Sequence, residues 1–171
     1  MVELELESRR RIYQVISDSP GIHFRALLDR LEYAQGTLQY HVRWLADEDL
    51  IDVSEDGDFT RYYPAGSFDP EDQAVMNALR RENARRIIAH LGADGALSTS
   101  ELAERLDRSK STVSWHLSRL GEADLVSKRR NGRSVEYSLT DPDRVMRLYT
   151  VHRKSLTDRV VDRVFGLWDS Y

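Results

Sequence analysis

Apolar residues recur at helical spacing three times between residues 79 and 120, which predicts three helices. The first helix is expected over 80–91. The second follows Ser98-Thr-Ser-Glu101, a capping box that satisfies free N–H groups at a helix start. Ser109 suits the N-cap of the third helix, which is expected over 110–121. One face of this third helix is predicted to be buried and consists of Val113, Leu117 and Leu120.

A hairpin signal follows these helices. Asn131-Gly132 is the strongest short signal for a tight β-turn, and it divides residues 125–139 into two predicted strands. The predicted order is therefore helix, helix, turn, helix and two-stranded hairpin. This order is that of a winged helix-turn-helix domain.

The same pattern occurs twice in the chain, because residues 7–66 align without a gap on residues 82–141 at an offset of 75. A turn glycine and a strand tyrosine fall in register with the three apolar helical stripes. The chain therefore contains two copies of one domain. The identical pairs are Glu7/Glu82, Arg10/Arg85, Arg11/Arg86, Ile12/Ile87, Leu27/Leu102, Arg30/Arg105, Leu31/Leu106, Thr37/Thr112, His41/His116, Leu45/Leu120, Asp49/Asp124, Leu50/Leu125, Gly57/Gly132 and Tyr62/Tyr137.

The first copy is predicted to have helices near 4–17, 24–31 and 36–46, and wing strands on either side of Asp56-Gly57. A turn-rich linker, Pro64–Pro70, joins the copies. The predicted fold class is mainly α with small β-hairpin wings. The predicted domains are two tandem winged helix-turn-helix domains over 1–66 and 71–140, followed by a long C-terminal helix within 141–171.

The C-terminal helix is expected to start at Asp141-Pro142-Asp143 and to reach Leu167, because an acidic N-cap and an early proline precede a long apolar stripe. Such a stripe needs a covering surface, which is either the domains of the same chain or a second subunit. We favour a homodimer. The stripe consists of Val145, Leu148, Tyr149, His152, Leu156, Val160, Val164, Leu167 and Trp168.

The helix-turn-helix segments resemble a known family. Residues 106–120 with the following Glu-Ala-Asp-Leu-Val look like ArsR/MarR-type winged-helix regulators, and residues 36–45 with Asp-Glu-Asp-Leu-Ile resemble archaeal regulators of the same kind. The tandem arrangement with the tail 155–168 is similar to haloarchaeal regulators. The resemblance implies transcription control, usually by a homodimer. Metal-sensing ArsR relatives use cysteine clusters, whereas this chain has no cysteine.

Charge separates the two copies. Residues 1–66 carry 7 basic and 13 acidic residues, a net charge of −6, whereas residues 71–140 carry 12 and 10, a net charge of +2. The second wing contains four cations in the six residues 128–133, and the first contains three anions in the five residues 54–58. Since DNA binding requires cations that meet phosphates, we expect the main DNA contact in the second copy.

The expected DNA-binding residues lie on the second recognition helix and its wing. Hydroxyl groups can contact phosphates or base edges, an aromatic ring can contact a thymine methyl group, and a helix N-terminus favours phosphate. For Trp115 the alternative is packing against a neighbouring domain. The predicted residues are Ser109, Lys110, Ser111, Thr112, Ser114, Trp115, Ser118, Arg119, Lys128, Arg129, Arg130 and Arg133.

The first copy offers a possible second DNA contact, since Gln and Arg can read bases. Its acidic wing argues against this role, and an interaction module or a ligand-sensing domain remain alternatives. The residues of the possible second contact are Gln35, Thr37, Gln39, Tyr40 and Arg43.

The predicted function is sequence-specific binding of double-stranded DNA by a transcriptional regulator. The alternative is a tandem winged-helix scaffold for protein interactions. The chain shows no phosphate loop and no nucleophile–base constellation, so an enzyme is not expected. Neither a cofactor nor a metal is expected, and a small-molecule effector is left open. His41 and His116 are expected to be structural or to contact phosphate. With 40% hydrophobic residues, an acidic N-terminus unlike a signal peptide and no apolar run of membrane length, the expected location is the cytoplasm.

Overall fold

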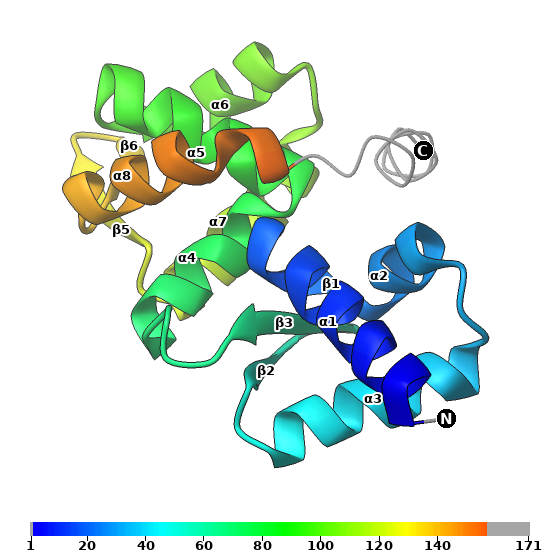
Figure 1. Cartoon of the computed structure of the whole chain (residues 1–171). Helices are drawn as coiled ribbons and strands as arrows, with labels where there is room; N and C mark the ends of the chain where they lie inside the picture. The colour runs from blue at the N-terminus through cyan, green and yellow to red at the C-terminus, as the bar shows by residue number, and fades with distance from the viewer. Residues whose placement is uncertain (1, 157–171) are drawn as a thin grey trace. The chain divides into compact units, whose positions relative to one another are not determined.

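The computed structural model describes residues 2–156. The chain folds into two compact units, which are treated separately (Figure 1). The N-terminal unit contains residues 2–73 and 154–156, and the C-terminal unit contains residues 74–153. In each unit helices pack around one small antiparallel sheet.

The elements of the N-terminal unit follow the predicted order. The three predicted helices are confirmed, and their ends lie within two residues of the expected positions. The elements are α1 (Val2–Asp18), β1 (Ile22–His23), α2 (Phe24–Leu31), α3 (Gln35–Asp47), β2 (Ile51–Asp56) and β3 (Phe59–Pro64).

The C-terminal unit repeats this order and adds α8, which packs against α5. Its elements are α5 (Glu82–Asp94), β4 (Leu97–Ser98), α6 (Thr99–Leu106), α7 (Lys110–Glu122), β5 (Val126–Asn131), β6 (Ser134–Leu139) and α8 (Pro142–His152). The 3-10 turn η1 (Arg153–Ser155) begins at the last residue of this unit.

The helix α4 (Pro70–Leu79) connects the two units and was missed by the sequence prediction. Its start carried a signal, because the Asp69 carboxylate accepts a hydrogen bond from the N–H of Asp72 at 2.7 Å and Pro70 opens the helix. The turn-like composition just before Asp69 obscured that signal.

Each sheet has three strands, so the predicted two-stranded hairpin is incomplete. The strand orders are β1-β3-β2 and β4-β6-β5. The registers agree at the offset of 75, since Asp56 pairs with Phe59 in one wing and Asn131 with Ser134 in the other. The repeat seen in the sequence is therefore a repeat of three-dimensional structure.

The turn of the second wing lies one residue later than predicted. Because Asn131 and Ser134 are paired, the two-residue loop is Gly132-Arg133 and not Asn131-Gly132. Gly132 has φ +63°, and a glycine at the first loop position is typical of a type II′ turn. Arg133 therefore sits at the tip of the wing.

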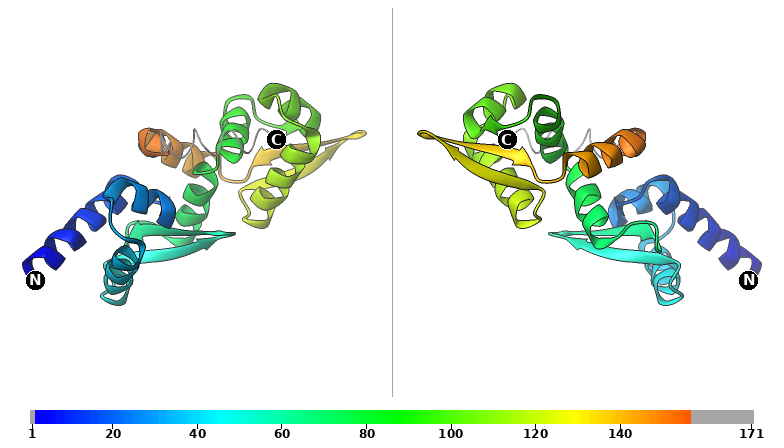
Figure 2. Two further views of the ribbon diagram at one scale, coloured as in Figure 1. Left: turned by 90° about the vertical axis from the view of Figure 1, so that its right-hand side faces the viewer. Right: turned by 90° about the vertical axis from the view of Figure 1, so that its left-hand side faces the viewer.

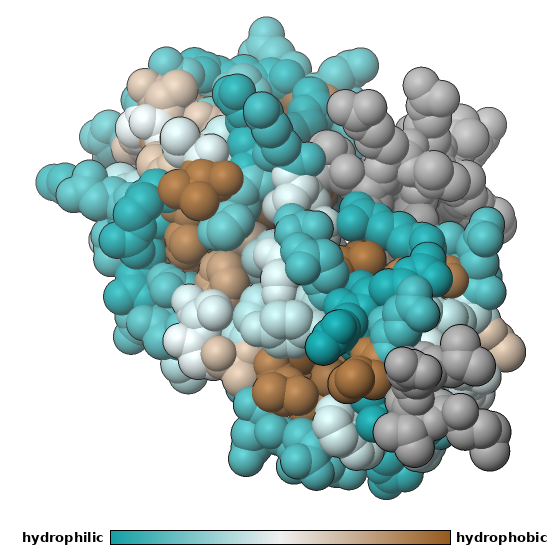
Figure 3. All heavy atoms as spheres, viewed as in Figure 1, coloured by the Kyte–Doolittle hydropathy of each residue, from teal (hydrophilic) through white to brown (hydrophobic). Residues whose placement is uncertain are grey.

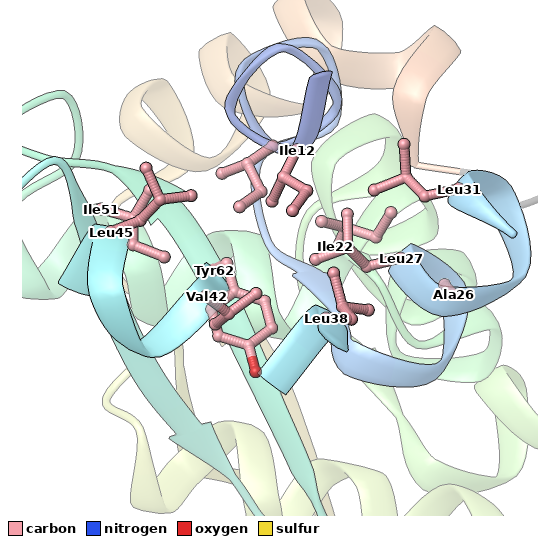
Figure 4. Close-up of a cluster of buried hydrophobic side chains, with 11 residues drawn as sticks. Ile12, Ile22, Ala26, Leu27, Leu31, Leu38, Val42, Leu45, Ile51 and Tyr62 are labelled. Atoms are coloured by element: carbon pink, nitrogen blue, oxygen red, sulfur yellow. The ribbon is translucent and has the colours of Figure 1, made fainter. Parts of the chain in front are cut away.

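The core of each unit comes from the predicted apolar stripes. Figure 4 shows the cluster in the N-terminal unit, in which Ile12, Leu27, Leu38 and Leu45 from three helices share one core with Ile51 of β2. The residues at the same repeat positions in the C-terminal unit are also buried: Ile87, Leu102, Val113, Leu120 and Val126.

The C-terminal helix is shorter than expected. α8 ends at His152 and the 3-10 turn η1 follows, so helix and turn together cover 14 residues, 142–155, and the predicted continuous helix to Leu167 is wrong. The start is as predicted, since Asp141 caps the helix by accepting a hydrogen bond from the N–H of Arg144 at 3.1 Å. Residues 157–171, which carry the second half of the expected stripe, lie outside the described residues.

Candidate nucleic-acid interface

The helix α7 has one buried and one exposed face. The predicted stripe is buried, with exposed fractions of 0% for Val113, 1% for Leu117 and 3% for Leu120. The opposite face is open, and its residues are Ser111, Ser114, Trp115 and Ser118. The structure thus presents the predicted reading face to solvent.

Hydroxyl groups gather at the N-terminus of α7. The Ser109 hydroxyl oxygen accepts a hydrogen bond from the N–H of Thr112 at 3.2 Å, which confirms Ser109 as the N-cap. The same hydroxyl lies 2.9 Å from the Thr112 hydroxyl and 3.0 Å from that of Ser111. Together with the exposed Lys110, these groups form a polar, cationic helix start that suits a phosphate.

An aromatic–cation pair lies in the middle of α7. The guanidinium carbon of Arg119 lies 4.9 Å from the centre of the Trp115 ring. The ring also contacts the buried His116 edge-on, with ring centres 4.8 Å apart. Trp115 nevertheless remains 52% exposed.

The wing of the C-terminal unit is exposed along its whole outer half, and in Figure 2 the hairpin β5–β6 projects beyond the helices of its own unit. Alternation places Lys128 and Arg130 on the side of the buried Val126, and Arg129 on the other side. Arg129 faces Glu136 across the strands, whereas Arg130 faces Val135. Lys128 and Arg130 therefore have no acidic residue opposite them on β6, and they lie on the side of the hairpin that also faces the domain core.

The residues of the possible second contact are exposed on α3: Gln35, Thr37, Gln39, Tyr40 and Arg43. Tyr40 is 55% exposed and holds the repeat position of Trp115. The N-cap of α3 is Ala34, where α7 has Ser109. The start of α3 thus lacks the hydroxyl cluster found on α7.

Arg9 of α1 stacks on α3, which the sequence prediction missed. Its guanidinium carbon lies 3.8 Å from the centre of the Trp44 ring and 6.0 Å from that of Tyr40. Glu5 lies 4.0 Å from the same guanidinium. His41, beneath this cluster, is only 4% exposed, and burial together with the nearby Arg9 lowers the pKa of its imidazole, against a smaller opposing effect of Glu5.

A buried arginine fixes the first wing. Arg61 of β3 donates from Nε to the Asp56 carboxylate at 2.8 Å and from Nη1 to the carbonyl oxygen of Gly21 at 3.1 Å. Its guanidinium also lies 5.0 Å from the Phe59 ring centre. The second wing has Glu136 at this repeat position. The first wing is therefore held to its own domain, with part of its acidic tip neutralised.

Other chemistry is not prominent in the described part of the chain. Within residues 2–156 no group of three or more His, Asp or Glu side chains is placed to hold a metal ion, and no helix there is long and apolar enough to cross a membrane. The surface seen in Figure 3 is mainly hydrophilic, with small separate apolar areas.

Comparison with known proteins matches both units to helix-turn-helix families. Residues 6–76 match an "N-terminal HTH domain" and residues 80–129 match a "Helix-turn-helix domain". The chain is also 32% identical over 79 residues to the transcriptional activator HlyU of Vibrio cholerae, which covers 46% of this chain and 72% of HlyU. The chain belongs to the helix-turn-helix transcriptional regulators.

This helix-turn-helix regulator has an archaeal relative. It is 30% identical over 135 residues to the uncharacterized HTH-type transcriptional regulator MJ1398 of Methanocaldococcus jannaschii, covering 79% of this chain and 34% of MJ1398. The regulator thus spans about a third of the length of that relative. The names of both relatives describe transcriptional regulators, which is the class of protein that the sequence predicts.

Two solved structures of other transcriptional regulators align with about half of the regulator. HlyU from Vibrio cholerae aligns with 51% of this chain and 94% of its own, at 29% identity and a TM-score of 0.44. The transcriptional repressor BigR from Xylella fastidiosa aligns with 46% and 82%, at 25% identity and a TM-score of 0.41.

Proposed function

We propose that this regulator binds double-stranded DNA sequence-specifically as a homodimer, and that the C-terminal unit makes the main contact. In this proposal α7 enters the major groove and the wing β5–β6 follows the phosphate backbone. The proposal depends on one observation: an exposed cationic wing borders an exposed recognition-helix face in the same unit. In this proposal the regulator binds genomic DNA in the cytoplasm.

The physical argument starts with the phosphates. DNA carries one negative charge per about 1.7 Å of helix axis, so a hairpin with Lys128, Arg129, Arg130 and Arg133 gains energy by releasing condensed counterions. The hydroxyl face of α7 adds hydrogen-bonding groups without a charge that DNA would repel. Phosphate contacts of the wing would position α7, and α7 would then read base edges.

The N-terminal unit is less suited to the main contact. Its wing tip carries Glu55, Asp56 and Asp58, and Arg61 binds Asp56 within the unit instead of presenting a cation. A second, weaker contact through Gln39 and Arg43 of α3 is compatible with this proposal. The same face could instead bind a protein or an effector.

The homodimer is proposed because a two-fold regulator doubles its contacts on a palindromic site. The outer face of α8 carries Val151, an apolar residue that is 68% exposed. Analytical ultracentrifugation of the full chain, alone and with duplex, tests this part. A monomer under both conditions would exclude it.

The DNA contact is tested with two charge-matched variants. R130E/R133E and R10E/R25E both lower the net charge by 4, but only the first alters the wing. In fluorescence anisotropy with duplexes selected from a random library, we expect the wing variant to lose at least tenfold in affinity, and the control on α1 and α2 to lose much less. Equal losses would contradict the wing assignment.

The scaffold alternative predicts a different result. If the wild-type chain enriches no sequence from the library and binds genomic duplex no better than random duplex, sequence-specific regulation through DNA would be refuted. A protein-interaction role would then explain the two helix-turn-helix units.

A further inference from the structure

We propose that Trp115 and Arg119 act as one base-reading pair, in which Arg119 binds a guanine and the Trp115 indole contacts the methyl group of a thymine in the neighbouring base pair. This inference rests on the proposed function, because it requires that α7 enter the major groove. It goes further by naming the two-base-pair step that the regulator prefers.

The two side chains share one face of α7. They are four residues apart, so they lie one above the other on the helix. The Arg119 guanidinium is folded over the indole, 4.9 Å from the ring centre. Since helical side chains lean toward the N-terminus, this fold brings the cation back to the level of Trp115, in the middle of the reading face.

The indole is held in position while much of its surface remains open. It contacts the buried His116 edge-on at 4.8 Å, and it is still 52% exposed. The serine-rich face around the indole offers it no apolar contact, so the exposed part of the ring is available to an apolar group of a ligand. In the major groove the apolar partner is the thymine methyl group.

The arginine has the complementary chemistry. A guanidinium forms two hydrogen bonds with O6 and N7 of guanine, which is the most common specific contact in the major groove. Stacking on the ring restricts the side chain before binding, so less conformational freedom is lost when those bonds form. Serine hydroxyls, by contrast, serve either base as donor or acceptor. Discrimination on this face should therefore depend on Trp115 and Arg119.

The close spacing of the pair indicates adjacent base pairs. Successive base pairs are about 3.4 Å apart along a strand, which is comparable with the 4.9 Å between guanidinium and ring. A guanidinium and an indole this close together cannot contact bases that are several base pairs apart. The predicted step is a G·C pair next to a T·A pair.

The N-terminal unit has no equivalent pair on its recognition helix. There Tyr40 and Trp44 hold the repeat positions of Trp115 and Arg119. The cation that stacks on them is Arg9, which comes from α1 and lies 4.0 Å from Glu5. The arrangement on α7 is therefore a property of the C-terminal unit and not of the repeated fold.

The first test compares the sequences that full-length variants select from a random duplex library. We expect wild type to enrich a G·C pair beside a T·A pair. R119A and R119K should lose the preference for guanine at that position, W115A should lose the preference for thymine, and the control R25A, at an exposed position on α2, should select the wild-type sequence. Circular dichroism checks that each variant is folded.

The second test changes single atoms of the DNA. On the wild-type site, 7-deazaguanine removes the N7 acceptor and uracil removes the thymine methyl group. We expect 7-deazaguanine to weaken wild type about tenfold and R119A hardly at all, and uracil to weaken wild type a few-fold and W115A hardly at all.

The outcomes separate the inference from the proposed function. If R119A weakens binding equally on all sequences and leaves the selected site unchanged, Arg119 contacts phosphate and the pair is refuted, while DNA reading by α7 stands. If W115A leaves thymine preference and the uracil effect unchanged, the indole does not read the methyl group and the pair is again refuted. If wild type enriches no sequence, the proposed function itself fails.

Discussion

Gly92 lies where α5 contacts α8, and a side chain added at this position would displace the side chain of Met146. A Cβ at Gly92 would overlap the sulfur of Met146. Alanine normally stabilises a helix interior by up to about 1 kcal/mol relative to glycine. We expect Gly92→Ala instead to lower the free energy of unfolding of the C-terminal unit by up to about 1 kcal/mol, because the flexible end of the Met146 side chain must leave its packed position to relieve the overlap. Urea unfolding of the full chain measures this change.

Two variants control for helix propensity at this site. Gly121 of α7 has no described heavy atom within 4 Å of its Cβ position, so Gly121→Ala should be neutral or stabilising. Adding Met146→Ala to Gly92→Ala should recover part of the loss by removing the overlapping sulfur. A stabilising Gly92→Ala would show that α8 does not pack on α5 as closely as described.

His41 should make the stability of the N-terminal unit depend on pH. Burial and Arg9 lower the pKa of its imidazole below 6.5, the value expected in the unfolded chain. As the pH falls below 6.5, the unfolded state takes up a proton that the folded state does not, so stability decreases. Above that pH both states are neutral and this contribution is constant. We therefore expect His41→Gln to flatten the stability profile between pH 7.5 and 5.5.

The measurement is hydrogen exchange of peptides from each unit, across that pH range. His152, whose pKa is lowered by burial and by Arg80, provides the matched variant in the C-terminal unit. His152→Gln should flatten the profile there and leave α1 and α3 unchanged. If the pH dependence of stability in His41→Gln equals that of wild type, the imidazole has the same pKa in the folded and unfolded states.

Sequence reasoning succeeded for residues whose role follows from local spacing. The buried stripe of α7 and the Ser109 cap are of this kind, because periodicity and capping act within a few residues. Arg9 and Arg61 were missed because arginines usually belong to solvated surfaces. Their partners are distant in sequence, since Arg61 binds the carbonyl of Gly21, 40 residues earlier.

At the scale of elements, the strand pattern of the second wing distinguishes its cations. Arg130 and Lys128 share a side with the domain core, and Arg129 faces Glu136 on the opposite side. We expect Arg130→Ala to weaken DNA binding by more than Arg129→Ala, and to reduce the slope of log affinity against log salt by about 1 per protomer. Both the affinity and its salt slope are measured by titrating one duplex with each variant at salt concentrations of about 50 to 400 mM.

Glu136 supplies the internal control for this ranking. Glu136→Gln should raise affinity slightly and make Arg129→Ala more costly, because the acid that opposes Arg129 is then neutral. Equal effects of Arg129→Ala and Arg130→Ala in both backgrounds would mean that DNA contacts the two sides of the hairpin alike.

The elements that sequence reasoning missed are short or have unmarked ends. β1 and β4 contain two residues each, too few to show an alternating pattern. The end of α8 at His152 is marked by neither Gly nor Pro, while the apolar spacing continues beyond it. The exposure of the candidate site residues followed from the sequence, since charge and hydroxyl composition are visible without knowing where each strand ends, whereas their contact with DNA stays a prediction.

At the scale of the whole molecule, one fold occurs twice with opposite charge. Net charges of −6 for residues 1–66 and +2 for residues 71–140 accompany the same strand register. The fold itself therefore does not determine which copy meets DNA. Surface charge can change along a repeated framework while the buried stripes stay constant, and in the proposed function it is this difference in charge that assigns different roles to the copies.

This difference predicts a salt-dependent effect of the first wing. Glu55 and Asp58 are exposed, and neither is the acid that Arg61 binds. If the first wing does not touch DNA, its charges act only over distance, which about 0.01 M salt permits and 0.5 M salt screens. We expect E55Q/D58N to raise affinity about threefold at 0.01 M salt and to leave it unchanged at 0.5 M, in fluorescence anisotropy with the selected duplex.

Leaving Asp56 in place keeps the bond to Arg61, so the variant changes charge without releasing the wing. Because screening removes long-range repulsion but not direct contact, the high-salt measurement distinguishes the two arrangements. A gain that persists at 0.5 M salt would show that the acidic tip lies against the DNA. The N-terminal unit would then share the interface, and the division of roles between the two copies would have to be abandoned.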